Sequence, residues 1–529
     1  MSRRWLRDAR RAMAYLPSWR ITRAPDAPAM PVRDPWPGDA NHGARLLRGE
    51  MELLGATRPL KAGVWQDQSG SPLLRAKAHG FTWLRDLRAL GTDAARLKAR
   101  ALVGDWIATP PTDKLAHRPD VTGARIAAWL GNYDFFFAAA DDLFRQRLMA
   151  RLVIDARWLA AAVPAEEMDA RALTALKGLI AAAVAMPEHA NYMTRALRFL
   201  TQELTRQILP DGCHAERSPA AHLLALQELT EIRALLQAAQ VAPPPALAGV
   251  IDRMGPALRT LRHGDGGLAL FNGSREDSAT LIEQVLAHAG RANRVAPPTP
   301  QGGFQRLQAG RTVMIVDCAA PPARGLDRCA HAGTLGMEIS VGRERLIVNC
   351  GAAPASAREW VDAVRATAAH STLVIAETNA AELRAEGLGR RPERVTAQRQ
   401  EDNGALWLDA SHDGWKKSFG AIHHRRLWLA QSGDEIRGED VVEAATPQPY
   451  VLRFHLHPGV QANVQQDGGG VLLRLPSGAG WRLRANASKL SLEDSIYLGG
   501  TEPRRCEQVV LTGYADGPQQ VKWAISKLG

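Results

Sequence analysis

The hydrophobic period of the sequence changes near residue 300, and this change limits the fold more than any other feature. From about residue 41 to 289, apolar residues recur every three or four positions, as in 138–159, 172–186 and 221–239. This spacing is typical of amphipathic helices. Prolines and a Pro-Asp-Gly turn divide this half into lengths of roughly 12 to 20 residues, which predicts stacked helical hairpins.

After the proline-rich segment 295–300, short runs alternate apolar and polar residues. Turn residues separate the runs, a pattern typical of an antiparallel β-sandwich. The runs are 312–316, 337–341, 345–349, 372–376, 405–410, 427–430, 451–456, 471–475 and 481–485. We therefore predict a basic N-terminal arm over 1–44, an (α/α) toroid-like helical domain over 45–294 and an antiparallel β-sandwich over 301–529. No strict repeat is visible, which favours a closed toroid over an open solenoid.

The composition is that of a soluble globular protein with more than one domain. The chain has 529 residues, 46% hydrophobic and 23% charged, which is too long for one ordinary core. No apolar run reaches the roughly 18 residues that a membrane-spanning helix needs. Residues 1–23 are rich in Arg and Trp but lack the apolar stretch of about 7 to 15 residues of a secretory signal. A basic amphipathic segment on an anionic surface is the alternative to a solvated or docked arm.

The net charge of +11 favours anionic partners. Acidic polysaccharide and nucleic acid both fit a basic chain, but no recognised nucleic-acid-binding module is present. The five cysteines are an odd number, so reduced thiols are expected rather than a disulfide framework.

His331, Asn349 and His370 each stand at the edge of a β-patterned run. Strands can bring residues together that are distant in sequence, so the three side chains are candidates for one polar site. Two imidazoles and an amide oxygen suit a divalent metal, zinc most readily. The alternative is a set of separate hydrogen-bonded histidines in the sheets, because none of the compact metal-binding spacings is present.

Four segments resemble motifs of the heparinase II/III family of polysaccharide lyases, and they follow one another along the chain in the family's order. Residues 329–338, Cys-Ala-His-Ala-Gly-Thr-Leu-Gly-Met-Glu, are similar to the family's His-x-His-x-Asp-x-x-Ser-Phe-Glu. Residues 346–351 resemble a Val-Asp-Pro-Gly strand end, and 365–372 resemble Arg-Ser-Thr-x-x-His-Asn-Thr. Residues 209–222 resemble Pro-Asp-Gly-x-x-x-Glu-x-Ser-x-x-Tyr-His. The resemblance covers about residues 45–520 and implies a toroid joined to a β-sandwich.

The resemblance also implies a reaction and a substrate. Such lyases cleave uronate-containing, glycosaminoglycan-like polysaccharides by β-elimination in a cleft between the two domains. The enzyme must neutralise the uronate carboxylate, supply a base and protonate the leaving oxygen. Family members work in the periplasm or cell envelope. No signal peptide is evident in this chain, which leaves a cytoplasmic location open.

On the sandwich side, the resemblance implies that His331 and His370 are ligands of a structural divalent metal, which is expected to be zinc. Asn349 stands where the family has Asp, and its neutral amide is a weaker ligand than a carboxylate. Cys329 takes the position of a family histidine near the reaction centre. Its thiolate could act as a base or bind the metal, and an inert thiol is the alternative.

On the helical side, Ala221 stands where the family has its catalytic Tyr, and a methyl group cannot transfer a proton. Asn191 resembles the Asn of an Asn-His pair, so its amide is expected either to bind a uronate carboxylate or to cap a helix. Tyr133 and Tyr192 are candidate replacement phenols, or else packed helix aromatics.

His214, Glu216, Arg217 and His222 complete the catalytic candidates. They surround a helix start predicted at 218–219, where Ser suits the N-cap and Pro the first helical position. The structural alternative pairs Glu216 with Arg217.

Two hypotheses follow. The first is a lyase-like enzyme that cleaves an acidic polysaccharide. The second is a catalytically degenerate protein of the same fold that binds polysaccharide or assists assembly of the cell envelope, as the replacements at Ala221, Cys329 and Asn349 suggest.

Overall fold

The computed structural model describes residues 24–529 except 62, 138, 165–168, 188–189, 291–300, 355, 467 and 488, and describes only the backbone of Ala190. The first 23 residues of the predicted arm and the proline-rich segment lie outside the described residues. The chain forms two compact units. One contains residues up to Gln207 together with Ala225–Ile251, and the other contains Ile208–Leu224 and Asp252–Gly529. The second unit thus includes two segments that precede the predicted sandwich domain.

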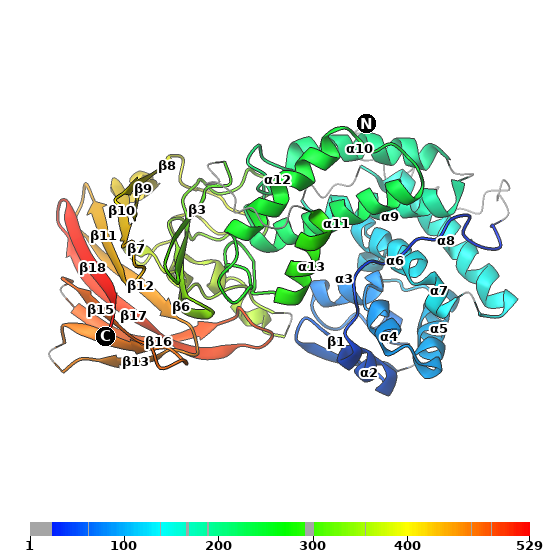
Figure 1. Ribbon diagram of the computed structural model, residues 1–529, viewed down its shortest axis with the longest axis horizontal. Helices are drawn as coiled ribbons and strands as arrows, with labels where there is room; N and C mark the ends of the chain where they lie inside the picture. Colours follow the sequence, from blue (N-terminus) through cyan, green and yellow to red (C-terminus); the bar gives the residue numbers. More distant parts are fainter. Residues whose placement is uncertain are drawn as a thin grey trace. The chain divides into compact units, whose positions relative to one another are not determined.

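The first unit is built mainly from helices (Figure 1). They are α2 (Ala40–Arg48), η1 (Val64–Gln66), α3 (Pro72–Gly80), α4 (Leu84–Leu90), α5 (Asp93–Ala108), η2 (Lys114–His117), α6 (Pro119–Gly131), α7 (Tyr133–Phe136), α8 (Asp142–Ala162), α9 (Arg171–Ala185) and α10 (Ala190–Gln207). Helices α11 (Pro219–Ala238) and α12 (Ala246–Thr260) contribute residues to both units. The three helical runs singled out in the sequence are confirmed as α8, α9 and α11. A hairpin of β1 (Glu50–Leu53) and β2 (Ala56–Pro59) was not predicted.

Two glycines allow α6 and α9 to pack at close range. A Cβ atom on Gly178 would lie 2.2 Å from the Cα of Gly123, so any side chain there would push the helices apart.

Next to this contact, Arg125 and Asp155 form a fully buried ion pair at 2.8 Å. The Arg125 guanidinium also lies 4.2 Å from the ring centre of Trp106. A buried pair of this kind needs hydrogen bonds and packing to offset its desolvation.

The second unit contains two antiparallel sheets, which confirms the predicted sandwich (Figure 1). One has the order β13-β14-β15-β18-β11-β10-β9-β8, and the other β16-β17-β12-β6-β5-β4-β3 with β7 paired to β12. Apolar residues of both sheets form one core, including Leu408 and Leu427 of the first and Met337 and Leu452 of the second. The strands are β3 (Phe304–Ala309), β4 (Thr312–Asp317), β5 (Met337–Val341), β6 (Glu344–Val348), β7 (Leu373–Ile375), β8 (Val395–Asp402), β9 (Ala405–Trp415), β10 (Ala421–Leu429), β11 (Glu435–Glu443), β12 (Gln448–Leu456), β13 (Gln461–Val464), β14 (Gly470–Arg474), β15 (Gly480–Ala485), β16 (Lys489–Tyr497), β17 (Arg504–Ala515) and β18 (Gln519–Lys527).

Short helical elements accompany the sheets: α13 (Ala279–Ala289), η4 (Arg358–Trp360), η5 (Ala363–Arg365), η6 (Thr367–Ala369) and α14 (Lys416–Phe419). Strands β4 and β5 are buried along their whole length. The outer side of β4 is covered because Leu261, Ala269 and Phe271 pack on Val313 and Ile315. This segment after α12 carries several residues of the candidate site.

Every alternating run predicted in the sequence coincides with a strand, but β10 begins at Ala421 instead of 427. The early part was missed because His423 and Arg425 interrupt the apolar pattern. Both side chains are buried and bind the Asp440 carboxylate at 2.7 Å. In the part of the chain that the structure describes, no helix is both long and apolar enough to cross a membrane.

Candidate functional site

The structure brings His331 and His370 together, as the sequence predicted. His331 Nδ1 lies 3.1 Å from His370 Nε2, and both side chains are buried. His370 follows η6 directly, and its Nδ1 donates to the Ala366 carbonyl at 2.9 Å. Gly273 N–H donates to His331 Nε2 at 3.0 Å. Hydrogen bonds therefore run in one direction through both rings.

This direction assigns the protons. Because His331 Nε2 accepts a hydrogen bond, its Nδ1 carries the proton and donates to His370. Burial lowers the pKa of His370 to about 4, and burial together with the neighbouring His370 holds the pKa of His331 well below its usual range. Both rings are neutral at pH 7 without a metal.

Asn349 points to different partners. Its Oδ1 accepts from Ser371 N–H at 3.0 Å, and its Nδ2 donates to Glu338 Oε1 at 3.1 Å. The amide therefore links two strand ends rather than completing a shell with the histidines. A metal ligand needs a free nitrogen lone pair, which the protonated Nδ1 of His331 does not offer. In this hydrogen-bond arrangement the facing ring nitrogens and the amide oxygen all have protein partners. Among the described residues no group of three or more His, Cys, Asp or Glu is positioned for a metal. Zinc binding by the two histidines and Asn349 stays a prediction.

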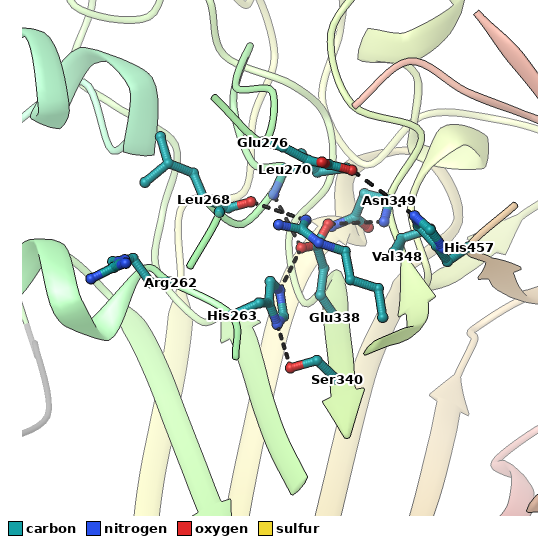
Figure 2. Close-up of polar contacts among 12 residues, drawn as sticks. Arg262, His263, Leu268, Leu270, Glu276, Glu338, Ser340, Val348, Asn349 and His457 are labelled. Carbon is teal, nitrogen blue, oxygen red and sulfur yellow. Dashed lines mark hydrogen bonds and ion pairs between the residues drawn. The ribbon is translucent and has the colours of Figure 1, made fainter. Parts of the chain in front are cut away.

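Glu338 is the centre of the polar network beside this trio (Figure 2). It lies on β5 with no solvent exposure. Its Oε1 accepts from the backbone and side-chain nitrogens of Asn349, and its Oε2 accepts from His263 Nε2 at 2.9 Å and Leu270 N–H at 3.1 Å. Burial alone would raise the pKa of Glu338, but the hydrogen bond from His263 and nearby positive charge hold it below its ordinary value. The carboxylate is a structural acceptor with four donors.

The loop after α12 is held against the sheet by the same network. His263 Nδ1 also bonds Ser340 Oγ at 2.9 Å, as Figure 2 shows. Arg345 on β6 binds Asp265 at 2.7 Å and donates to the Leu268 carbonyl at 3.0 Å. Sequence analysis did not select His263, although the turn that follows it, Gly264 to Gly267, was a visible signal of a loop.

His214 and His222 lie close together but inside the protein. His222 Nδ1 accepts from His214 N–H at 3.3 Å, and its Nε2 donates to the Met254 carbonyl at 2.9 Å. Burial lowers the pKa of His222 to about 4. The His214 side chain is also buried, and its Nδ1 accepts from Glu216 N–H at 3.3 Å. His222 is thus a neutral ring at pH 7, and both side chains hold local backbone.

The predicted helix start is confirmed. Helix α11 begins at Pro219, and Ser218 Oγ accepts from Ala221 N–H at 3.4 Å. Ala221 therefore lies in the first helical turn, where it contributes one methyl group.

Arg217 pairs with Asp317 instead of with Glu216. The Arg217 guanidinium contacts the Asp317 carboxylate and donates to the carbonyls of Gly302 at 2.8 Å, Ala319 at 3.1 Å and Ala320 at 2.7 Å. Arg217 has φ of +51°, a left-handed conformation that ordinary residues adopt only where surrounding contacts stabilise it. Arg217 acts as a buried clamp between α11 and the strand end after β4.

Replacing Arg217 with Lys is expected to lower the free energy of unfolding of the second unit by about 2 kcal/mol. Lysine keeps the charge, but its single nitrogen cannot reach the carboxylate and three carbonyls together. Chemical denaturation would measure the loss. Arg437→Lys, at an exposed ion pair with Glu435, is the control and should change stability by less than about 0.5 kcal/mol. Equal effects at the two positions would contradict the clamp.

Asn272 links the backbone at Arg217 to the backbone at His331, and sequence analysis missed it. Its Nδ2 donates to the Arg217 carbonyl at 2.8 Å, and its Oδ1 accepts from His331 N–H at 3.0 Å. It also has a left-handed backbone, with φ of +46°. The signal in the sequence was the Asn-Gly pair 272–273, which favours a tight turn.

Cys329 is the cysteine that faces solvent. None of the five cysteines forms a disulfide, and Cys213, Cys318 and Cys350 are buried. Burial raises the pKa of the Cys350 thiol to about 12, so that thiol is not a nucleophile at neutral pH. Cys329, in the motif at residues 329–338, is exposed, so its thiol is accessible from solvent.

Asn191 belongs to the first unit, where it is exposed on α10. It lines a cavity of about 470 Å³ together with Tyr192 and the arginines Arg157, Arg195 and Arg198. Burial raises the pKa of Tyr192, while Arg157 acts in the opposite direction through its charge and a hydrogen bond. Tyr133 instead packs on Phe137 with ring centres 4.3 Å apart.

Comparison with known proteins gives a consistent picture. Residues 101–289 match the family description "Heparinase II/III N-terminus", and residues 291–524 match "Heparinase II/III-like, C-terminal". FtsZ-localized protein C of Caulobacter vibrioides is 32% identical over 520 residues, covering 93% of this chain and 89% of that protein.

Solved structures share the fold at low identity. Heparinase III superposes with a TM-score of 0.76 and 14% identity, covering 99% of this chain and 89% of the other. Heparan sulfate lyase HepC from Pedobacter heparinus has a TM-score of 0.62 and 15% identity, covering 99% and 88%.

Proposed function

Because this chain belongs to the heparinase II/III family, we propose that it is a member that acts by binding rather than by cleavage, and that it works at cell division together with FtsZ. The observation that carries the proposal is the state of the proton-transfer positions. Ala221 has no ionisable group, His214 and His222 are both buried, and burial lowers the pKa of His222 to about 4.

β-Elimination needs a base and an acid that reach the substrate. His222 uses both ring nitrogens for backbone contacts, and His214 is enclosed. Arg217 is occupied by Asp317 and three carbonyls. Freeing any of these groups would break contacts that hold the start of α11 within the second unit. Their roles are those of structural residues.

The relative named FtsZ-localized protein C supports the second part of the proposal, since its identity of 32% extends over nearly the whole chain. Its name describes localisation with FtsZ and no enzymatic reaction. The lyases of known structure are below 25% identical and support the fold only.

The binding partner suggested by the first unit is acidic. Three arginines and the exposed Asn191 amide line one cavity there. Guanidinium groups bind carboxylate and sulfate in bidentate fashion, and an amide adds a donor. An acidic polysaccharide fits this chemistry and the basic charge of the chain.

The purified protein is expected to produce no unsaturated uronate ends. The measurement is ultraviolet absorbance of the new double bond across a panel of glycosaminoglycans, alginate and bacterial exopolysaccharides, with an active family lyase as the positive control. A steady rise in absorbance with any polymer would overturn the absence of cleavage.

A fluorescent fusion of the full chain is expected to accumulate where FtsZ assembles. Depletion of FtsZ should then disperse the signal, and purified protein should sediment with FtsZ polymers. A diffuse signal in dividing cells, together with no co-sedimentation, would remove FtsZ from the proposal and leave the absence of cleavage untouched.

A second candidate function is lyase activity that uses Cys329 as the base, because this thiol is exposed within a family motif. In that case Cys329→Ser would abolish the increase in absorbance that cleavage causes. Cys506→Ser, at a half-buried cysteine, would leave that increase unchanged. The panel above decides between the two functions before any variant is needed.

A further inference from the structure

Four arginines outside the family motifs line a cavity of about 500 Å³ in the second unit. They are Arg259, Arg262, Arg306 and Arg343. The walls come from the end of α12 and the loop after it, the start of α13, strand β3 and the turn between β5 and β6. The volume is in the range of small-ligand sites.

Positive charge exceeds negative charge around this cavity. Two carboxylates also line it, so four arginines against two acids leave two positive charges. Both acids are engaged: Glu283 pairs with Arg262 at 2.7 Å, and Asp265 pairs with Arg345 at 2.7 Å. Across the described part of the chain, the other three lining arginines have no carboxylate partner within ion-pair distance.

Arg306 shows the imbalance most clearly. Its Nε and one terminal nitrogen donate to Gln308 Oε1 at 3.2 and 3.0 Å. Its other terminal nitrogen donates to the carbonyls of Arg262 and Thr260. These acceptors satisfy the donors but carry no net charge. Burial, and then repulsion by Arg262, lower the pKa of Arg306 to about 10, and a bound anion would relieve both effects.

A helix start contributes further positive potential. Ala279 and Thr280, the first two residues of the 11-residue α13, line the cavity. Ser278 Oγ caps the N–H of Leu281 at 3.3 Å, and the earlier N–H groups of a helix have no intrahelical acceptor. Helix starts favour anions for this reason.

Hydrogen bonds on both sides of one ring fix the inner wall. It contains His263, whose ring nitrogens bond Ser340 and Glu338 as drawn in Figure 2. Burial lowers the pKa of His263 despite the nearby Glu338 carboxylate. The arginine cavity therefore has a preformed floor.

We propose that the arginine cavity binds an oxyanion, namely a carboxylate, sulfate or phosphate group of a small ligand. The site is independent of both lyase chemistry and association with FtsZ, so it goes beyond the proposed function. Guanidinium groups that lack a counter-ion, next to a helix start, match the geometry and charge of such groups.

Isothermal titration of the full chain at low salt would test the site with three probes: inorganic phosphate, inorganic sulfate and glucuronate. At least one probe is expected to bind, and binding should weaken as sodium chloride is raised. Binding of phosphate alone would point to a phosphorylated ligand, binding of glucuronate to an acidic sugar, and binding of all three to a general oxyanion site. No binding by any probe would overturn the proposal.

Variants locate the binding. Arg306→Gln should weaken it at least tenfold, and so should Arg343→Gln. Arg306 is half-buried and Arg343 is exposed, so the second variant keeps the test valid if the first unfolds. Arg437→Gln, at an exposed ion pair on β11, is the matched control and should bind as the wild type does. Equal affinity in all three variants would place the anion elsewhere and overturn the proposal.

Discussion

Lowering the pH from 7 to 5 is expected to remove several kcal/mol from the stability of the second unit. Burial lowers the pKa of His222 and His370 to about 4 and that of His455 to about 3. In the unfolded chain these groups titrate near 6.5. The folded state therefore binds protons more weakly, and stability that is complete above pH 6.5 is lost as the pH falls toward 4.

The size of the effect follows from proton linkage. At pH 5, a histidine whose pKa falls from about 6.5 to about 4 on folding costs about 2 kcal/mol. Three such groups give about 6 kcal/mol, a large part of the stability of a typical domain. Among the described acidic groups of this unit with a resolved shift, Asp317 has a raised pKa and opposes the trend.

Hydrogen exchange, followed peptide by peptide over β5 and β12, would measure this loss between pH 7 and 5 after correction for the intrinsic rate. His455→Gln should make the protection less dependent on pH. His424→Gln, at a partly exposed histidine, is the control and should leave the dependence unchanged. Protection that stays constant down to pH 5 would contradict the expectation.

Glu338→Gln is expected to destabilise the second unit by about 3 to 5 kcal/mol. The buried carboxylate accepts four hydrogen bonds, and an amide presents a donor where an acceptor is required. Removing one member of a buried charged network leaves donors without partners, which costs this much.

Denaturant unfolding of the variant would measure the loss, with Glu435→Gln at an exposed ion pair as the control. The folded pKa of Glu338 lies below its ordinary value, so its contribution is complete above about pH 4.3 and is lost as the pH falls through the folded pKa. The free energies of unfolding of the wild type and of Glu338→Gln should therefore differ most near neutral pH. A loss under about 1 kcal/mol would mean that the network tolerates an amide.

Both predictions concern residues at family motif positions or directly bound to them. In this chain the side chains are buried and bonded to protein partners: Glu338 accepts four hydrogen bonds, and Arg217 pairs with Asp317. This is consistent with the proposal of a binding protein.

Local pattern was enough for most of the fold. The helices α8, α9 and α11 and the predicted strands were found because apolar periodicity reports which side of an element is buried. The start of β10 was missed because its inward residues, His423 and Arg425, are polar and are paired with Asp440 on a neighbouring strand. Such pairing is invisible in a local window.

The candidate site was predicted in part. The meeting of His331 and His370 followed from their positions at strand edges. The partners that decide their chemistry did not: Gly273 assigns the proton on His331, and Asp317, one hundred residues away, occupies Arg217. Asn191 and the exposed Cys329 stay predictions as functional residues.

The sequence by itself determined a helical half followed by antiparallel sheets, the family, and the absence of a phenol at Ala221, because periodicity and residue identity are local properties. Only the tertiary structure decided which nitrogens carry protons, which carboxylate binds each arginine and where uncompensated arginines gather. Those outcomes depend on hydrogen bonds and burial between residues that are distant in the chain, and both arise only when the chain has folded.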